Sequence, residues 1–232
     1  MSVTNIVMLV KDRPALTRQS LQSLYRHTDP AQFTLTVIDD ASTAVNYMML
    51  RSLMHGGDLV RVENSPGIVG RARNTGVWFT QQVNPRGDFL YLSDNDVYFT
   101  LDWLVILTEL FMAAEPTGYR LFSGGTHPFH KWTTAAQVRL RGTWHIRSHD
   151  AVSGYSHLMR WDTWDRYGPL DAHAPGTGQS EDWKFCQDIV HDGYKVGSVW
   201  PELVYACGLT NTEGQPAVGQ EHMPRYPGVI QE

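Results

Sequence analysis

The stretch FLYLSDNDVYF, residues 89–99, combines a short apolar run with a cluster of acidic residues. Its apolar part, residues 89–93, predicts a short buried strand that ends at Asp94, Asn95 and Asp96. Two carboxylates that lie two residues apart after a buried strand can meet one hard cation from the same side, and such a cation normally keeps open positions for phosphate oxygens. The alternative interpretation is a turn capped by Asp and Asn, which is a common use of these residues.

The pattern of a strand followed by a helix recurs on both sides of this stretch. Strands are predicted over residues 5–10, 33–38 and 59–63; one helix starts at residues 12–14, and others cover residues 45–53, 69–82 and 102–114. This alternation with short connections indicates a parallel sheet covered on both faces, an open α/β fold. Ligands of such folds bind beyond the carboxyl ends of the strands.

The second half of the chain is less regular and rich in Trp, His and Gly. One clear helix is predicted there, over residues 180–192, with Gly193 as its C-terminal stop. No internal repeat, low-complexity stretch or linker is visible. We therefore expect a single domain over residues 1–232.

The composition excludes several classes of protein. The chain has 232 residues, a net charge of −5 and 42% hydrophobic residues, which excludes a histone-like basic protein and a disordered chain. Cys186 and Cys207 form no CxxC pair, so we expect two buried reduced thiols. The apolar run after Met1 is too short for a signal peptide, and no apolar stretch reaches transmembrane length. We expect a protein without a membrane partner, in a bacterial or phage-infected host cytoplasm.

Acidic residues also follow a second strand. Asp39 and Asp40 end the strand at residues 33–38, where they can cap a helix or accept hydrogen bonds from a nucleobase or ribose. Further on, Gly70 leads into a helix that carries Arg71 and Arg73, a combination that favours an anion. The alternative for these two side chains is a solvated arginine pair.

Glu181 and Asp182 open the helix in the second half. Acidic residues in a first turn ordinarily stabilise the helix dipole, and the alternative is a general base presented to a substrate hydroxyl. Ten histidines are present without an HExxH pair, and His222, after a glycine-rich stretch, is the one considered as a late metal ligand. No nucleophile motif of the GxSxG type occurs.

Taken in order, these pieces resemble the inverting family 2 of the GT-A glycosyltransferases. The resemblance is carried by NIVMLVKDRPALTRQSLQSL, VIDDAST, NSPGIVGRARNTGV, FLYLSDNDVYF, AVSGYSHLMRWDTWDRYGPLD and SEDWKFCQDIVHDGYKVG. It implies a Rossmann-like α/β/α sandwich with a mostly parallel central sheet. Residues 1–125 would form the half that binds the nucleotide sugar, and residues 126–232 the half that binds the acceptor.

The resemblance also implies roles for single residues. Asp96, with Asp94 and His222, would hold Mn²⁺ or Mg²⁺ against the diphosphate of the donor, with a UDP-sugar favoured. Asp182 would deprotonate the acceptor hydroxyl, and Glu181 would orient the acceptor or the donor sugar. The donor would be bound by Val10, Lys11, Asp12, Arg13, Asp39, Asp40, Gly67, Arg71, Asn74, Asp94, Asn95, Gly124, Gly125, Ser153 and Gly154.

The segment between Glu115 and Asp150 contains no acidic residue. Basic and aromatic side chains there suit a polyanionic acceptor such as an anionic glycan or DNA, including hydroxylated bases of phage-type modified DNA. The alternative is that these positive charges serve the donor diphosphate or pair within the domain. The acceptor-side residues are Lys131, Trp132, Arg139, Arg141, Trp144 and Arg147.

Three other functions compete with this one. A retaining transferase on the same fold differs only in the anomer of its product. A non-catalytic module that binds sugar nucleotides or glycans would not need Asp96 and Asp182. A nucleotidyltransferase of related fold lacks support, because its usual glycine-rich loop with a lysine is missing near the N-terminus. Either a monomer or a homodimer is compatible with the sequence.

Overall fold

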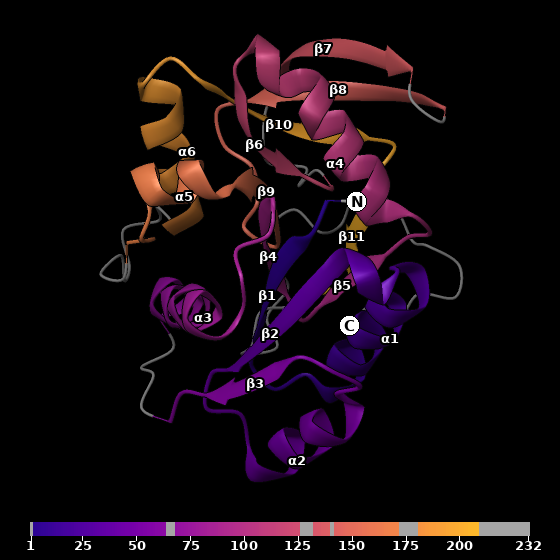
Figure 1. Ribbon diagram of the computed structural model, residues 1–232, viewed down its shortest axis with the longest axis vertical. Helices are drawn as coiled ribbons and strands as arrows, with labels where there is room; N and C mark the ends of the chain where they lie inside the picture. Colours follow the sequence, from indigo (N-terminus) through magenta and orange to yellow (C-terminus); the bar gives the residue numbers. More distant parts are fainter. Residues whose placement is uncertain (1, 64–67, 126–131, 140–141, 172–180, 209–232) are drawn as a thin grey trace.

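The computed structural model describes residues 2–63, 68–125, 132–139, 142–171 and 181–208, with only the backbone given for residues 132–139 (Figure 1). Four predicted site residues, Gly67, Lys131, Arg141 and His222, lie outside this part, as do the side chains of Trp132 and Arg139. No helix within the described ranges is long and apolar enough to cross a bilayer.

A nine-stranded sheet forms the centre of the molecule. In sheet order its strands are β3 (Asp58–Arg61), β2 (Phe33–Asp39), β1 (Thr4–Val10), β4 (Phe89–Asp94), β9 (Ser156–Arg160), β6 (Tyr119–Ser123), β10 (Lys195–Trp200), β8 (Thr143–His149) and β7 (Trp132–Arg139). The strands β9 and β8 run antiparallel to their neighbours and the others share one direction. The mixed, mostly parallel sheet confirms the expected fold class.

Helices cover both faces of this sheet (Figure 1). α1 (Pro14–His27), α2 (Ala44–Leu53) and α4 (Trp103–Ala114) contribute to one hydrophobic core, and α3 (Val69–Val83), α5 (Trp161–Tyr167) and α6 (Glu181–His191) to the other. Two short 3₁₀ helices, η1 (Pro30–Gln32) and η2 (Glu115–Thr117), complete the helical elements of the described chain.

The side chains of β1 explain why its sequence is apolar throughout. Ile6, Met8 and Val10 join the core under α1 and α4, and Val7 and Leu9 join the core under α3. Successive side chains of a strand point to opposite faces, so a strand covered on both faces has no polar alternation. This is the burial pattern that residues 5–10 predict.

The registers of β1 bring the acidic strand ends together. Val10 pairs with Asp39 of β2, and Leu9 pairs with Asp94 of β4. A small second sheet, β5 (Val97–Phe99) with β11 (Val204–Ala206), follows directly after Asp96. The chain therefore returns from its second half to the edge where β1, β2 and β4 end.

The second half is more regular than its sequence indicates. Besides the predicted helix it contains α5 and the strands from β7 to β11, which the sequence did not reveal. The strand β9 is only five residues long and lies antiparallel between β4 and β6, so it breaks the predicted alternation. The expectation for the two cysteines is confirmed, because both Cys186 and Cys207 are buried and free.

Candidate active site

Backbone strain marks the carboxyl ends of β1 and β2. Asp12, Arg13 and Ala41 all have positive φ angles, of 51°, 53° and 53°. Such conformations cost on the order of 1–3 kcal/mol each and cluster at functional sites. The two turns are tied together, since Ser42 Oγ accepts from the Asp12 amide at 2.8 Å and the Asp12 carboxylate accepts from Asn46 Nδ2 at 2.7 Å.

Asp39 and Asp40 are buried at this edge and incompletely satisfied. Their nearest cations are distant, with Arg61 Nε 3.7 Å from Asp39 and Lys11 Nζ 3.7 Å from Asp40. One oxygen of each carboxylate, Oδ2 of Asp39 and Oδ1 of Asp40, has no hydrogen-bond partner in the described part of the chain. Burial raises the pKa of Asp39 and outweighs the hydrogen bond from Ser42 and the charge of Arg61. The pair keeps acceptor capacity that a ligand can use.

A buried arginine joins β4 to α6. Arg73, on α3, is 3% exposed; its guanidinium donates to Asp94 Oδ1 at 2.5 Å and to Glu181 Oε1 at 3.1 Å. Burial acts to lower the pKa of Arg73, but Asp94 and Glu181 outweigh it and the pKa is raised. Burial also raises the pKa of Glu181, against the opposing effect of Arg73.

The sequence singled out Arg71 for the donor, and the structure places Arg71 on the exposed side of α3. Arg73 points inward with the other buried positions of the helix, Gly70, Val77 and Thr80. It is therefore no member of a solvated pair. The signal was available, because residues three and seven apart share one helix face.

Asp182 faces the same cluster from the first turn of α6. Its Oδ2 accepts from the Gly154 amide at 2.7 Å and its Oδ1 from the Trp183 amide at 2.8 Å. A Cβ on Gly154 would lie 2.6 Å from Arg73 Nη1, so the close approach requires glycine. Ser153, beside it, accepts from the Ser156 amide through its carbonyl at 3.5 Å.

His157 is a buried neighbour that the sequence analysis missed. Its Nε2 lies 3.1 Å from the Val152 carbonyl, and Val152 also contacts the Cys186 thiol through its amide at 3.5 Å. These bonds hold the loop that presents Gly154 to Asp182. Burial lowers the pKa of His157 to about 4, against the attraction of Asp182. The imidazole is therefore neutral at pH 7.

Asp96 forms an ion pair with Arg13 across the strand ends. Burial and the charge of Asp94 raise the pKa of Asp96 to about 6, against the opposing effect of Arg13. Gly208 lies against this pair, with no room for a side chain. The middle residue of the motif, Asn95, has a different task, because its Nδ2 donates to the Asp12 carbonyl at 3.1 Å and to Thr17 Oγ1 at 2.6 Å.

Other predicted donor residues have structural partners. Both amide atoms of Asn74 bind the backbone of Leu170, at 2.8 and 2.9 Å. A Cβ on Gly124 or Gly125 would overlap Val204, so these glycines allow β11 to pack against the end of β6. The carbonyl of Val10 accepts from the Asp40 amide at 2.8 Å, which joins β1 to the turn after β2.

Two of the acceptor-side residues lie on β8. The Arg147 guanidinium stacks over the Trp200 ring at 4.8 Å, and Trp144 packs against the core under α4. Neighbouring strands are about 4.8 Å apart, so β8 lies roughly 19 Å from β4 across the sheet. Three strands therefore separate Trp144 and Arg147 from Asp94.

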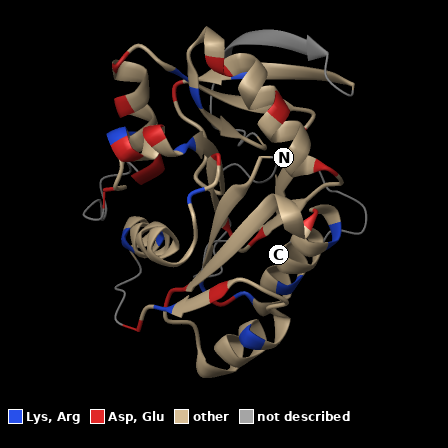
Figure 2. Cartoon of the chain, viewed as in Figure 1, with Lys and Arg blue, Asp and Glu red and all other residues tan. Residues whose placement is uncertain are grey.

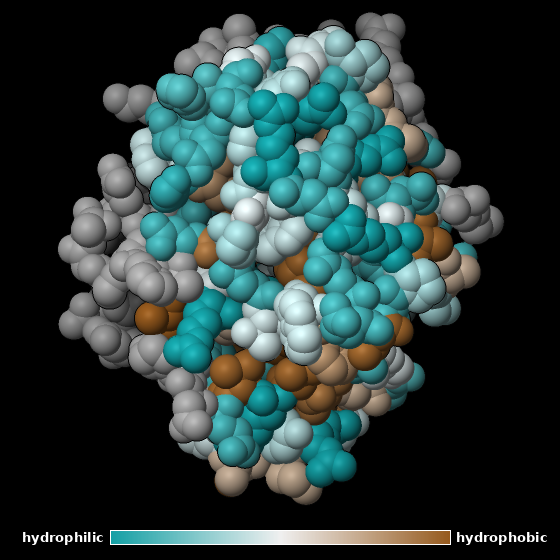
Figure 3. Space-filling view, turned by 60° about the vertical axis from the view of Figure 1, so that its left-hand side comes forward, coloured by the Kyte–Doolittle hydropathy of each residue, from teal (hydrophilic) through white to brown (hydrophobic). Residues whose placement is uncertain are grey.

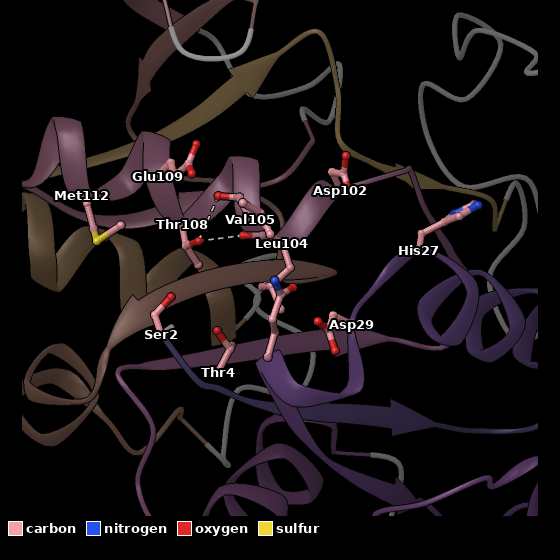
Figure 4. Close-up of a pocket in the computed structure, with 11 residues that line it drawn as sticks. Ser2, Thr4, His27, Asp29, Asp102, Leu104, Val105, Thr108, Glu109 and Met112 are labelled. Carbon is pink, nitrogen blue, oxygen red and sulfur yellow. Dashed lines mark hydrogen bonds between the residues drawn. The ribbon is translucent and has the colours of Figure 1, made fainter.

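A pocket of about 500 Å³ lies at the opposite edge of the sheet (Figure 4). It is lined by Thr4 at the start of β1, by His27 and Asp29, and by Glu109 on α4. Thr108 Oγ1, at its wall, donates to the Leu104 carbonyl at 2.8 Å. The lining contains no lysine or arginine, so it does not favour a phosphate. The acidic strand ends face the other way.

Charges of both signs meet at the strand ends and on α5 and α6 (Figure 2). The carboxylates Asp94, Asp96, Glu181 and Asp182 outnumber Arg13 and Arg73, so the site has an excess of negative charge. No group of three or more His, Cys, Asp or Glu residues within the described ranges could hold a metal ion. Asp94 and Asp96, the two described residues that the sequence predicts for a cation, each form an ion pair with an arginine.

Comparison with known proteins gives a likeness in structure alone. No family model matches the chain and no curated protein matches it. A solved mannosyltransferase, PcManGT from Pyrobaculum calidifontis, in complex with GDP-Man and Mn²⁺, is similar with a TM-score of 0.64 and 16% identity over 89% of this chain. S. aureus TarS 1-349 is similar with a TM-score of 0.64 and 15% identity over 88% of this chain.

The chain spans 57% of the first of these structures and 59% of the second. The likeness shows that the chain has the same fold as these two structures. At such identities the likeness does not extend to activity, substrate or metal.

Proposed function

We propose that the chain is a metal-dependent glycosyltransferase that moves a sugar from a nucleotide-sugar donor to an acceptor hydroxyl, with inversion and with Asp182 as the general base. The observation that carries the proposal is the buried cluster at the carboxyl edge of the sheet, where Arg73 holds Asp94 and Glu181 and lies beside Asp182. Titratable groups with perturbed pKa values at a ligand-binding edge are typical of functional sites.

Asp39 and Asp40 suit the nucleoside of the donor. Each retains a buried carboxylate oxygen that has no hydrogen-bond partner among the described residues, and nucleobases and ribose supply N–H and O–H donors. The strained turn at Asp12 and Arg13 closes the same end of β1. A UDP-sugar is the donor favoured by the resemblance, and the bound GDP-Man of PcManGT makes a GDP-sugar the second choice.

Asp94 and Asp96 suit Mn²⁺ or Mg²⁺. Both are oxygen ligands in a site with excess negative charge, and the raised pKa of Asp96 reflects a charge that a cation would stabilise. A bound divalent ion supplies charge stabilisation for the leaving diphosphate. Further ligands would come from the diphosphate and, as the resemblance implies, from His222.

Asp182 suits the acceptor side. The amides of Gly154 and Trp183 fix the orientation of its carboxylate, and a fixed carboxylate can accept the proton of an attacking hydroxyl. Glu181 is held by Arg73 and would orient the sugars. The basic residues of the acceptor-side segment, such as Arg147, suit an anionic acceptor, which is a glycan or DNA.

The test measures turnover of a panel of sugar nucleotides in the presence of Mn²⁺, Mg²⁺ or EDTA. Turnover is detected as release of the nucleoside diphosphate. We expect release from one donor that depends on the metal, and a product with the inverted anomer. A retained anomer would establish the retaining alternative. Binding of a donor without any turnover, with or without acceptors, would establish a non-catalytic binding module.

A further inference from the structure

An exposed tryptophan lies on the outer side of α3, away from the buried cluster. Trp78 is 61% exposed and lines a pocket of about 320 Å³ between α3 and the end of α5. The pocket is lined by Asn74, Trp78, Gln81, Arg86, Trp164, Asp165, Gly168 and Pro169. Because Trp78 lines this pocket, its indole offers apolar area there that a ligand can cover.

The walls of the pocket are already fixed. Asn74 clamps the backbone of Leu170, which holds the segment carrying Pro169 against α3. Arg86 binds Asp165 through two hydrogen bonds, of 2.7 and 2.9 Å, and its guanidinium also lies 4.7 Å from the centre of the Trp161 ring. The pocket is therefore preformed, which lowers the entropic cost of binding.

Charge and polarity select the class of ligand. Arg86 and Asp165 neutralise each other, so the pocket favours an uncharged ligand over a phosphate or a peptide of strong charge. The lining combines the Trp78 indole and the Pro169 ring with the Gln81 amide and an ion pair. This mixture of apolar and polar groups fits a sugar ring, which has apolar C–H faces and hydroxyls at its edge.

The pocket itself is small for a protein partner. The side of the molecule that carries α3, α5 and α6 is mostly hydrophilic, with hydrophobic side chains gathered in its lower half (Figure 3). A protein interface needs a wider continuous patch than one indole in a shallow pocket. A single sugar unit of a longer chain matches the pocket better.

We infer that the Trp78 pocket binds one neutral sugar unit of a glycan acceptor, outside the transfer site. The inference rests on the proposed function, because that function makes the glycan an acceptor. Trp78 follows Arg73 by five residues, which corresponds to about 7.5 Å along α3. A glycan of several units could then occupy the pocket while its end lies near Asp182.

The experiment is calorimetric titration of the whole protein with maltohexaose, cellohexaose, mannohexaose and chitohexaose. We expect at least one of them to bind, and Trp78→Ala to weaken that binding at least about tenfold, because an aromatic anchor carries much of the affinity of a small site. Trp78→Phe keeps a ring face and should stay within about threefold. Leu101→Ala, at a residue that is 67% exposed elsewhere, is the matched control.

Each outcome of this titration decides whether the Trp78 pocket binds a sugar. If none of the four glycans binds, or if Trp78→Ala binds as well as wild type, the pocket is no sugar site. If sedimentation shows a dimer that Trp78→Ala dissociates, the indole serves a second copy and the inference is wrong. Trp78-dependent glycan binding without turnover of any sugar nucleotide would uphold the pocket and overturn the proposed transfer.

Discussion

Two groups of carboxylates lie along one edge of the sheet, and the protein holds them differently. Asp39 and Asp40 lie 3.7 Å from their cations, and one oxygen of each carboxylate has no hydrogen bond to any residue that the structure describes. Asp94 and Glu181 bind the single guanidinium of Arg73 at 2.5 and 3.1 Å. The first group is left for a ligand to complete, while the carboxylates of the second are anchored by the protein, although Nε of Arg73 has no hydrogen-bond partner in the described part of the chain.

The difference separates two functions that the sequence presents alike. A buried acceptor without a hydrogen bond destabilises the folded protein, and a ligand that donates a hydrogen bond to it removes this cost. Asp39 and Asp40 therefore favour binding of a ligand. Carboxylates held by a buried guanidinium at hydrogen-bond distance have a fixed geometry, which catalysis requires. Substitutions that should affect turnover, folding and donor affinity separately test whether the two groups differ in this way.

The largest effect is expected at the base. Asp182→Asn should reduce sugar transfer by about 10²- to 10⁴-fold, the usual contribution of general base catalysis. Donor affinity should be unchanged, because the substitution leaves the nucleoside end intact. Nucleoside diphosphate release measures the first quantity and titration with donor the second. Asp188→Asn, on the exposed side of α6, is the control, and equal turnover in the two variants would exclude Asp182 as base.

The second effect is on folding. Arg73→Met leaves Asp94 and Glu181 without their buried partner, and should lower the free energy of unfolding by about 3–5 kcal/mol in urea titrations. Arg71→Met, on the exposed side of the same helix, should change it by no more than about 0.5 kcal/mol. If the two variants lose equal stability, the cluster is not the preorganised element that we describe.

The third effect depends on pH. Because the folded pKa of His157 is about 4 and the unfolded value is about 6.5, the unfolded chain takes up a proton first as the pH falls. Stability should therefore be complete above pH 6.5 and decrease from there to pH 4, with His157 contributing on the order of 3 kcal/mol.

His157→Gln should remove this part of the pH dependence in urea titrations between pH 4.5 and 7. His191→Gln, at a histidine that is 91% exposed, should leave it in place. Identical pH profiles for wild type and His157→Gln would show that His157 is not buried as a neutral imidazole.

The smallest effect is on donor affinity. Asp40→Asn should weaken binding of the preferred sugar nucleotide about tenfold, because a charged acceptor bond contributes about 1.5 kcal/mol. Stability should hardly change, since Lys11 is 3.7 Å away. Calorimetric titration checks the affinity, with Asp162→Asn on the exposed side of α5 as the control. Unchanged affinity would remove Asp40 from the donor site.

Much of the first half could be predicted from the sequence. Continuous apolar runs such as residues 5–10 and 89–93 indicate strands that are covered on both faces, and the parallel registers then bring Asp39 and Asp94 to one edge. The acidic residues Glu181 and Asp182 at its start and Gly193 after its end were sufficient to predict α6. Local pattern was sufficient where neighbouring strands are close in sequence.

The rest depended on contacts between distant segments. Arg71 and Arg73 differ only in which side of α3 they occupy, and the partners of Arg73 are 21 and 108 residues away. β9 is inserted between β4 and β6 by pairing that no local pattern records. His157 is significant only because that insertion places it behind the loop that contacts Asp182.

The most direct test of the central claim is thermal unfolding of wild type and Asp96→Asn with UDP-, GDP- and CMP-sugars, each with Mn²⁺ and with EDTA. A donor at about 100 times its Kd should stabilise the folded state by about 2.7 kcal/mol. We predict that one donor raises the Tm of wild type with Mn²⁺ only, and that Asp96→Asn loses this shift. A set of donors that leaves the Tm unchanged, or a shift that survives both EDTA and Asp96→Asn, would contradict a metal-dependent nucleotide-sugar site at these strand ends.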